Sequence, residues 1–121
     1  MDRGDGIELL GMAFQGKHGV RPAEREQAQE FKVDIELGAD LAQAARSDQL
    51  ADTVDYTRVR RIARDVIEGP PARLLETLAG RIAEQVLEVP GVTSVSVRVA
   101  KRPPSMQPIE AAAVRINRTR A

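Results

Sequence analysis

The stretch EFKVDIELGADL, residues 30–41, alternates apolar and polar side chains with a period of two. In a β-strand the apolar members would share one face, and these are Phe31, Val33, Ile35 and Leu37. The charged residues between them would point to the other face. The stretch therefore predicts a strand that buries one face and exposes the other.

A second strand, IELLGMAFQG at residues 7–16, precedes it and ends at Gly16. We expect the two strands to form a long antiparallel hairpin with a wide, irregular connection over residues 16–28. This connection holds His18, the only histidine of the chain, and a charged cluster that includes Glu24. A histidine in such a turn is more often a packing residue than a catalytic base, so we expect His18 to be structural.

Two helices follow, over residues 55–69 and 73–88. Asp55 is placed to cap the first helix and Gly69 to end it. The Pro-Pro pair after Gly69 separates the two helices. Each helix has an apolar stripe at helical spacing. The stripe residues are Val59, Ile62, Ala63, Val66 and Ile67 in the first helix and Leu74, Leu75, Leu78, Ile82 and Val86 in the second.

Two more strands, over residues 93–101 and 110–117, flank a proline-rich loop at 102–108. The order of elements predicts an α+β fold: a single domain over residues 1–121, with a four-stranded antiparallel sheet and two helices on one face. Both edges of such a sheet remain open, and pairing between copies of the chain would close the sheets into a barrel. A chain of this size has little room for a private pocket, so we expect a small-molecule site to be shared between subunits.

The composition narrows the functional class. The charges balance, with 18 Lys and Arg against 18 Asp and Glu, so nucleic-acid binding is not favoured. The basic run RVRR at 58–61 is typical of a solvated helix face. With one histidine and no cysteine, a zinc site is not expected. No apolar stretch is long enough for a membrane span, and the N-terminus lacks the pattern of a signal peptide, so we expect a soluble cytoplasmic protein.

Four polar side chains do not fit the structural pattern. Lys101 has the parity of the inward-facing valines of its strand, so its ammonium either leaves the edge of the sheet or lies in a partly dry place, where it could act as an acid or base. Tyr56 at the first helix start is either a packed ring or a phenol placed for proton transfer. Glu24 is either a solvated turn residue or part of a site. Glu76 suits the positive end of the second helix, but it lies near the buried stripe and could accept two N–H donors from a guanidine-like ligand.

Over nearly its whole length the chain resembles the dihydroneopterin aldolases of the folate pathway. The segments that carry the resemblance are GMAFQGKHGV, ER followed by QEFKVDIEL, ADL with SDQLADTVDY, LLETLAGRIA, and VSVRVAKRPP before a closing VRINR. One departure is Arg102, which stands where the family often has proline after lysine. The resemblance implies the tunnelling fold of this family, in which barrel rings of subunits stack as a homo-octamer with active sites at subunit boundaries.

The resemblance also implies a set of site residues. The family's catalytic glutamate, tyrosine and lysine match Glu24, Tyr56 and Lys101, and its pterin-anchoring glutamate matches Glu76. The residues that would line the pterin are Leu75, Val20 and, from the adjacent subunit, Val54 and Asp55.

The implied reaction is a retro-aldol cleavage of 7,8-dihydroneopterin into 6-hydroxymethyl-7,8-dihydropterin and glycolaldehyde. The dihydropterin imine is its own electron sink, so no cofactor, metal or Schiff base is expected. The implied partners are the pterin and other copies of the chain, without nucleic acid or membrane. Three alternatives stay open: an epimerase of dihydroneopterin or its triphosphate, an oxygenase side reaction, and a pterin- or purine-binding ring without catalysis.

Overall fold

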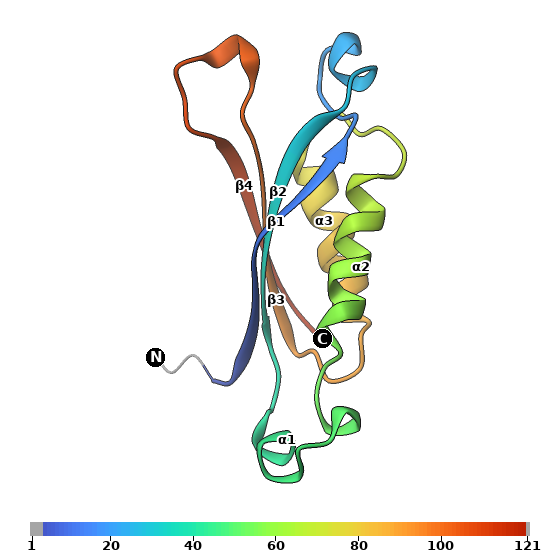
Figure 1. The fold of residues 1–121 in the computed structure, drawn as a ribbon, viewed down its shortest axis with the longest axis vertical. Helices are drawn as coiled ribbons and strands as arrows, with labels where there is room; N and C mark the ends of the chain where they lie inside the picture. The colour runs from blue at the N-terminus through green and yellow to red at the C-terminus, as the bar shows by residue number, and fades with distance from the viewer. Residues whose placement is uncertain (1–3, 121) are drawn as a thin grey trace.

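A computed structural model describes residues 4–120, apart from the side chain of Pro104. Its strands are β1 (Gly6–Gly16), β2 (Gln29–Gly38), β3 (Ser94–Lys101) and β4 (Ala112–Thr119), and its two long helices are α2 (Tyr56–Ile67) and α3 (Leu75–Leu87). The strands form one antiparallel sheet in the order β1-β2-β3-β4, and both long helices lie on the same face of it (Figure 1). The predicted α+β class is therefore confirmed. The predicted domain also includes residues 1–3 and 121, which lie outside the described part of the chain.

The core lies between the helices and the sheet face that they cover. Ile35 of β2 lies opposite Val97 of β3, and both are fully buried, as the period-two pattern predicts. Helix α3 adds Leu78, Ile82 and Val86 to this core. Burying an aliphatic side chain of this kind contributes about 1.5–3 kcal/mol, so the alternation seen in the sequence is what holds the two layers together.

Leu74 does not belong to the buried stripe, and that prediction is wrong. It precedes α3 as the N-cap residue, has an extended backbone (φ −118°, ψ 144°) and is 47% exposed. Because Leu74 is not helical, the helical spacing that placed it with Leu78 does not apply to it. The stripe begins with the next residue, Leu75, which is partly buried and packs against the core.

β1 contains a bulge that was not predicted. Its register with β2 shifts between Leu9 and Met12, where Gly11 has a φ of +70°. The Gly11 amide donates to Asp34 Oδ1 at 2.6 Å, and Asp34 Oδ2 lies 3.6 Å from the Arg98 guanidinium. Asp34 thus satisfies the amide that the bulge removes from the ladder, which gives this charged residue a structural role.

Short elements at the two ends of the molecule were also not predicted. The β1–β2 connection contains a 3-10 helix, Pro22–Arg25, and the β3–β4 loop contains another, Pro104–Met106. The chain between β2 and α2 forms α1 (Ala42–Ser47) and a 3-10 turn, Leu50–Asp52. Figure 1 shows the first two connections at one end of the long axis and α1 at the other. The start of α2 therefore lies far from the end of β3.

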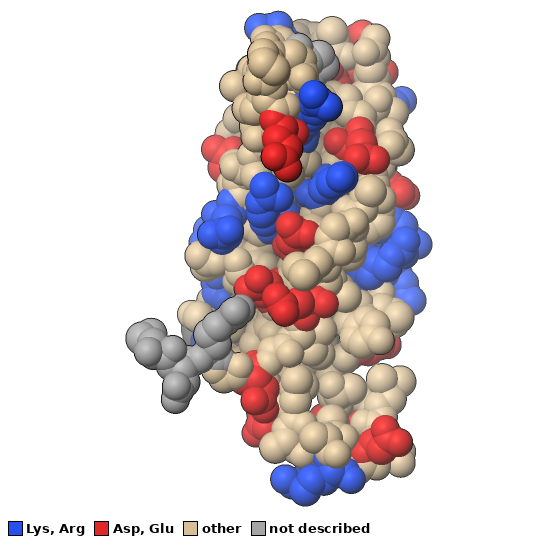
Figure 2. All heavy atoms as spheres, turned by 60° about the vertical axis from the view of Figure 1, so that its left-hand side comes forward, with Lys and Arg blue, Asp and Glu red and all other residues tan. Residues whose placement is uncertain are grey.

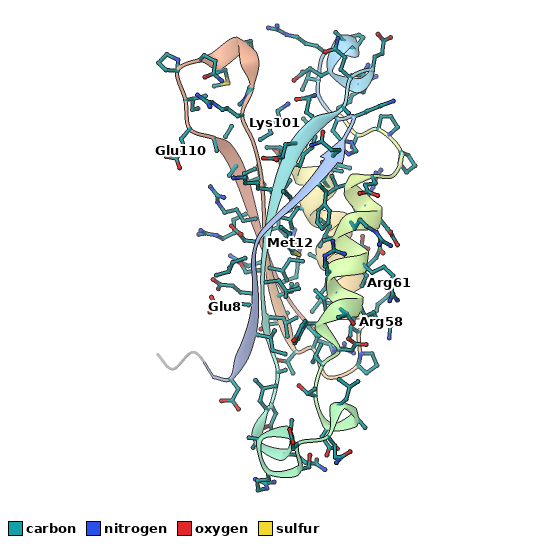
Figure 3. The ribbon with its side chains drawn as sticks, viewed as in Figure 1. Glu8, Met12, Arg58, Arg61, Lys101 and Glu110 are labelled. Carbon is teal, nitrogen blue, oxygen red and sulfur yellow. The ribbon has the colours of Figure 1, made fainter. Side chains whose placement is uncertain are left out.

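The face of the sheet away from the helices is open and charged. Basic and acidic side chains are intermingled on the side of the molecule seen in Figure 2. Glu8 points away from the helices (Figure 3). Arg58 and Arg61 point outward from α2 and are exposed, so the prediction that the basic run lies on a solvated helix face is confirmed for them. Among the described residues, β1 and β4 each pair with one strand, so both sheet edges are open as predicted. No helix within the described part of the chain has the length and apolar character of a membrane span.

Candidate active site

The connection between β1 and β2 fixes the position of Glu24. The carboxylate oxygen Oε1 of Glu24 accepts a hydrogen bond from the Arg21 amide at 3.1 Å. Arg25 closes the turn from the other side, because its guanidinium donates to the carbonyl oxygens of Gly19 and Val20 at 2.9 and 2.8 Å. The polar turn therefore aims the Glu24 carboxylate in one direction.

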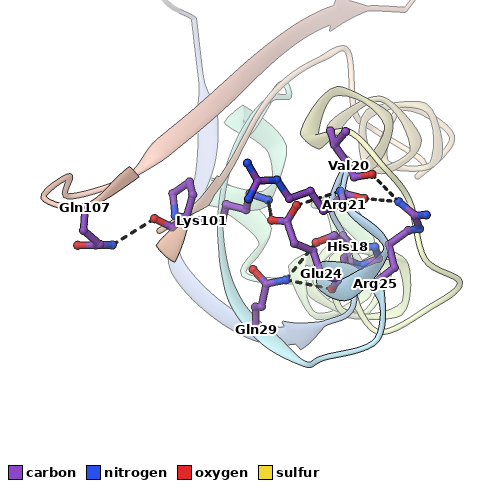
Figure 4. A network of polar contacts seen from close by, with 10 residues as sticks. His18, Val20, Arg21, Glu24, Arg25, Gln29, Lys101 and Gln107 are labelled. Atoms are coloured by element: carbon purple, nitrogen blue, oxygen red, sulfur yellow. Dashed lines mark hydrogen bonds and ion pairs between the residues drawn. The ribbon is translucent and has the colours of Figure 1, made fainter. Parts of the chain in front are cut away.

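Lys101 meets this carboxylate at the end of β3. Its Nζ lies 2.9 Å from Glu24 Oε2, and the two side chains are 14% and 24% exposed (Figure 4). β3 stays regular to its last residue, which pairs with Ala112, and the Lys101 side chain is partly buried. Its role as an acid or base stays a prediction. Hydrogen bonds from the Lys101 ammonium and the Arg21 amide hold the pKa of Glu24 below its usual value. A charge-assisted bond of this kind is directional, so the pair fixes the position of the ammonium.

Two further side chains hold the turn in place. The side-chain amide of Gln29 donates to the carbonyl oxygens of His18 and Glu24 at 3.2 and 3.1 Å. Gln29 was not singled out from the sequence, where its place at the start of β2 is its only distinguishing feature. His18 is 1% exposed, and its ring nitrogens bond the backbone of Ile67 and Ala72. The expectation that His18 is structural is confirmed.

The start of α3 lies against the same turn. The Gly19 amide donates to the Ala72 carbonyl at 2.9 Å, three residues before α3 begins at Leu75. Leu75 is partly buried, and Glu76 lies in the first helical turn as predicted. The Glu76 carboxylate is exposed rather than close to the buried stripe, and Val20 is 64% exposed. One end of the molecule thus carries five of the predicted site residues.

Tyr56 lies at the opposite end of α2 from the turn that carries Glu24. It is the first residue of α2 and is 55% exposed. The last residue of that helix, Ile67, contacts His18, and a helix of 12 residues is about 18 Å long. Within one chain the structure therefore brings Lys101 to Glu24 but leaves Tyr56 apart from both.

Val54 and Asp55 lie with Tyr56 at that distant end. Asp55 is the N-cap of α2 as predicted, and its Oδ1 accepts hydrogen bonds from the Thr57 hydroxyl and, at 3.1 Å, from the Thr57 amide. Both bonds lower the pKa of Asp55, and the bond from the Thr57 hydroxyl has the larger effect. Val54 as a whole residue is 2% exposed and belongs to the core of its own chain, so it offers almost no surface to a ligand.

An open hollow of about 630 Å³ lies beside Lys101, a size typical of small-ligand sites. It is lined by Gln29, Glu30, Lys32, Arg98, Ala100, Lys101, Arg102, Glu110 and Ala111. Glu24 and Glu76 are not among its lining residues, so this hollow does not by itself unite the predicted site. Within residues 4–120 no group of three or more His, Asp or Glu side chains is placed to hold a metal ion.

Comparison with known proteins agrees with this fold. The chain matches the family model of FolB, dihydroneopterin aldolase, over residues 7–117. It is 48% identical over 97 residues to the dihydroneopterin aldolase of Streptomyces coelicolor, across 80% of this chain and 82% of that one. It is 43% identical over 103 residues to "Probable dihydroneopterin aldolase 3" of Arabidopsis thaliana, across 84% of this chain but 64% of the longer plant protein. The crystal structure of E. coli dihydroneopterin aldolase in complex with neopterin has a TM-score of 0.88 at 26% identity, and the match covers 94% of this chain and 98% of that chain.

The chain belongs to the dihydroneopterin aldolase family. It is by that membership an enzyme of the lyase class, in a family that acts in folate biosynthesis. The resemblance, the fold and the enzyme class predicted from the sequence are confirmed.

Proposed function

We propose that this enzyme cleaves 7,8-dihydroneopterin into 6-hydroxymethyl-7,8-dihydropterin and glycolaldehyde, without a metal or a Schiff base and with some epimerisation of the substrate. The observation that carries the proposal is the Lys101–Glu24 pair, joined at 2.9 Å at a partly buried strand end. The neopterin bound by the E. coli relative supports a pterin as the small-molecule partner.

The protein does not need to supply an electron sink, because the dihydropterin imine accepts the electrons of the breaking bond. The protein must move protons and hold the bond in line with the ring π system. As the bond breaks, the Lys101 ammonium, which Glu24 orients, gives a proton to the imine nitrogen of the ring, and the amine that remains takes the proton of the side-chain hydroxyl through a water. Tyr56 delivers a proton to the new hydroxymethyl carbon and recovers one from the ring N–H, and Glu76 binds the N–H edge of the pterin.

A complete site would need two copies of the chain. Lys101 and Glu24 lie together near the start of α3, whereas Tyr56 lies at the far end of α2. The open edges of β1 and β4 would pair in a ring and bring Tyr56, Val54 and Asp55 of one copy to Lys101 of the next. We infer tetrameric rings that stack as an octamer.

Two alternatives concern the same site. An epimerase of the triphosphate would need free cations near the mouth of the site. Arg25 is held by two backbone carbonyl oxygens of its own turn, and Arg102 donates to the Ile109 carbonyl at 3.0 Å. These engagements leave the exposed Arg21 as the arginine of this group that a triphosphate would need. A non-catalytic pterin-binding ring would not need the Lys101–Glu24 pair, so the aldolase remains the better proposal.

Product analysis tests the proposal directly. The purified protein is incubated with 7,8-dihydroneopterin, with a chelator and without oxygen, and the products are separated by chromatography. We expect hydroxymethyldihydropterin and glycolaldehyde in equal amounts. The epimer as sole product would make the protein an epimerase, and bound but unconverted pterin would make it a binding ring.

Lys101→Ala tests the assigned proton-transfer group. Loss of a positioned proton-transfer group should lower kcat by about 10²–10⁴-fold while neopterin binding is retained. The matched control is Lys32→Ala. Lys32 also lines the hollow beside Lys101, but it is exposed, because its position in β2 places its side chain on the sheet face away from the core. Equal effects of the two substitutions would remove Lys101 from the mechanism.

A further inference from the structure

His18 joins segments of the chain that carry different parts of the candidate site. Its Nε2 lies 2.6 Å from the carbonyl oxygen of Ile67, the last residue of α2. Its Nδ1 lies 3.0 Å from the amide nitrogen of Ala72, in the connection that leads to α3. The next residue, Gly19, donates to the Ala72 carbonyl at 2.9 Å. We call these three hydrogen bonds the histidine clasp.

The two ring bonds fix the protonation of the imidazole. The Ala72 amide can only donate, so Nδ1 accepts and carries no proton. The Ile67 carbonyl can only accept, so Nε2 carries the proton and donates it. The clasp therefore requires a neutral ring in the Nε2–H tautomer. A second proton on Nδ1 would face the Ala72 amide hydrogen and break that bond.

The surroundings of the ring favour the neutral state. His18 is 1% exposed and packs edge-on against Phe31, with the ring centroids 5.2 Å apart. Burial lowers the pKa of His18, and the positive charges of Arg81 on α3 and Lys101 on β3 lower it further, against the raising effect of the bond to the α2 carbonyl. The acidic residue of the adjoining turn, Glu24, is itself engaged by the Lys101 ammonium.

We propose that His18 is a positioning residue, which holds the turn that carries Glu24 in fixed relation to the start of α3 that carries Glu76. The inference rests on the proposed function for its kinetic consequence. A pterin bound at Glu76 meets Lys101 correctly only if these two segments keep their distance. A misplacement of about 1 Å can cost 10²-fold in rate, so the clasp would act on catalysis without touching the substrate.

The tautomer can be read directly. His18 is the only histidine, so the ring-nitrogen spectrum of ¹⁵N-histidine-labelled protein belongs to it alone. We expect the neutral Nε2–H tautomer at neutral pH, and we expect the ring to gain its second proton only at a lower pH than a free histidine does. An imidazolium or an Nδ1–H tautomer at neutral pH would overturn the inference.

Three substitutions separate positioning from packing. His18→Phe keeps an aromatic ring and removes both ring bonds, whereas His18→Gln keeps a donor near Nε2 and His18→Asn keeps an acceptor near Nδ1. We expect folded His18→Phe to lose at least about tenfold in kcat and in neopterin affinity. The Gln and Asn variants should each recover part of both. The control is Phe31→Leu, which trims the neighbouring ring but leaves the clasp, and which should lower the Tm without changing kcat or Kd.

A folded His18→Phe protein with wild-type kcat and neopterin Kd would refute the positioning role. If that variant does not fold, the Gln and Asn variants decide the same question, since wild-type constants in both would show that neither bond matters. If the wild-type protein does not cleave dihydroneopterin, the proposed function fails by itself. The ring tautomer and the neopterin Kd of the variants then still decide the inference about His18.

Discussion

Replacing Gly19 by alanine should disable Glu24 without changing any group assigned to the chemistry. A Cβ at position 19 would lie 2.6 Å from Glu24 Cδ and 2.7 Å from Oε1, and it would also press on Glu24 Cβ. Ordinary contact distances between carbon atoms are about 3.5–4.0 Å. Because the first side-chain atom is also in the way, rotating the carboxylate does not relieve the contact, and Glu24 must shift by about 1 Å.

A shift of about 1 Å is large compared with the range of distances over which the Lys101–Glu24 hydrogen bond can persist. Moving Oε2 by about 1 Å would lengthen the 2.9 Å contact beyond the reach of a hydrogen bond. We expect kcat to fall by about 10²-fold, as for other misplacements of this size. Overpacking costs about 1–3 kcal/mol of unfolding free energy, so the protein should remain folded with a lower Tm.

The assay is steady-state turnover of dihydroneopterin together with thermal unfolding of the same preparation. The matched control is Gly80→Ala in α3, where a Cβ meets nothing closer than 3.9 Å. Removing a glycine from a helix interior should stabilise the protein by about 0.5–1 kcal/mol and leave kcat unchanged. Full turnover by Gly19→Ala would refute the claim that the position of Glu24 matters.

Two further substitutions test the sheet and the ion pair. Asp34→Ala removes the acceptor of the Gly11 amide and the partner of Arg98, so urea unfolding should show a loss of about 1 kcal/mol; an unchanged midpoint would show that water replaces the carboxylate. Because the pKa of Glu24 is lowered in the folded protein, its stabilising effect is complete above its ordinary pKa of 4.5 and is lost as the pH falls through the lowered value. Urea unfolding of Glu24→Gln across that acidic range should therefore depend less on pH than that of the wild type, and parallel curves would contradict the assignment.

The sheet could be predicted from the sequence because its pattern is local. The period-two alternation of β2 decides which face is buried, and the burial of Ile35 needs no distant information. α1 (Ala42–Ser47) was missed because six residues are too few to show a helical period. The bulge at Gly11 depends on a carboxylate from the neighbouring strand, which periodicity does not include.

The candidate site could be predicted only in part. The parity of β3 left two positions open for the Lys101 side chain, of which the structure shows the partly buried one. Its partner Glu24 lies 77 positions away, and their contact depends on how the turn folds. Glu76 was placed in the correct helical turn, yet its exposure depends on where α3 begins. The separation of Tyr56 from Lys101 follows from the direction of α2 along the molecule, which local patterns do not specify.

Mixing two inactive variants tests most directly whether Lys101 and Tyr56 of different copies form the site. Lys101→Ala and Tyr56→Phe chains are co-expressed, and the turnover of the mixed oligomers is compared with that of each variant alone. If each site takes Lys101 from one copy and Tyr56 from the next, random assembly leaves about a quarter of the sites intact, and about a quarter of wild-type turnover should return. Mixed oligomers no more active than the separate variants would contradict the shared site.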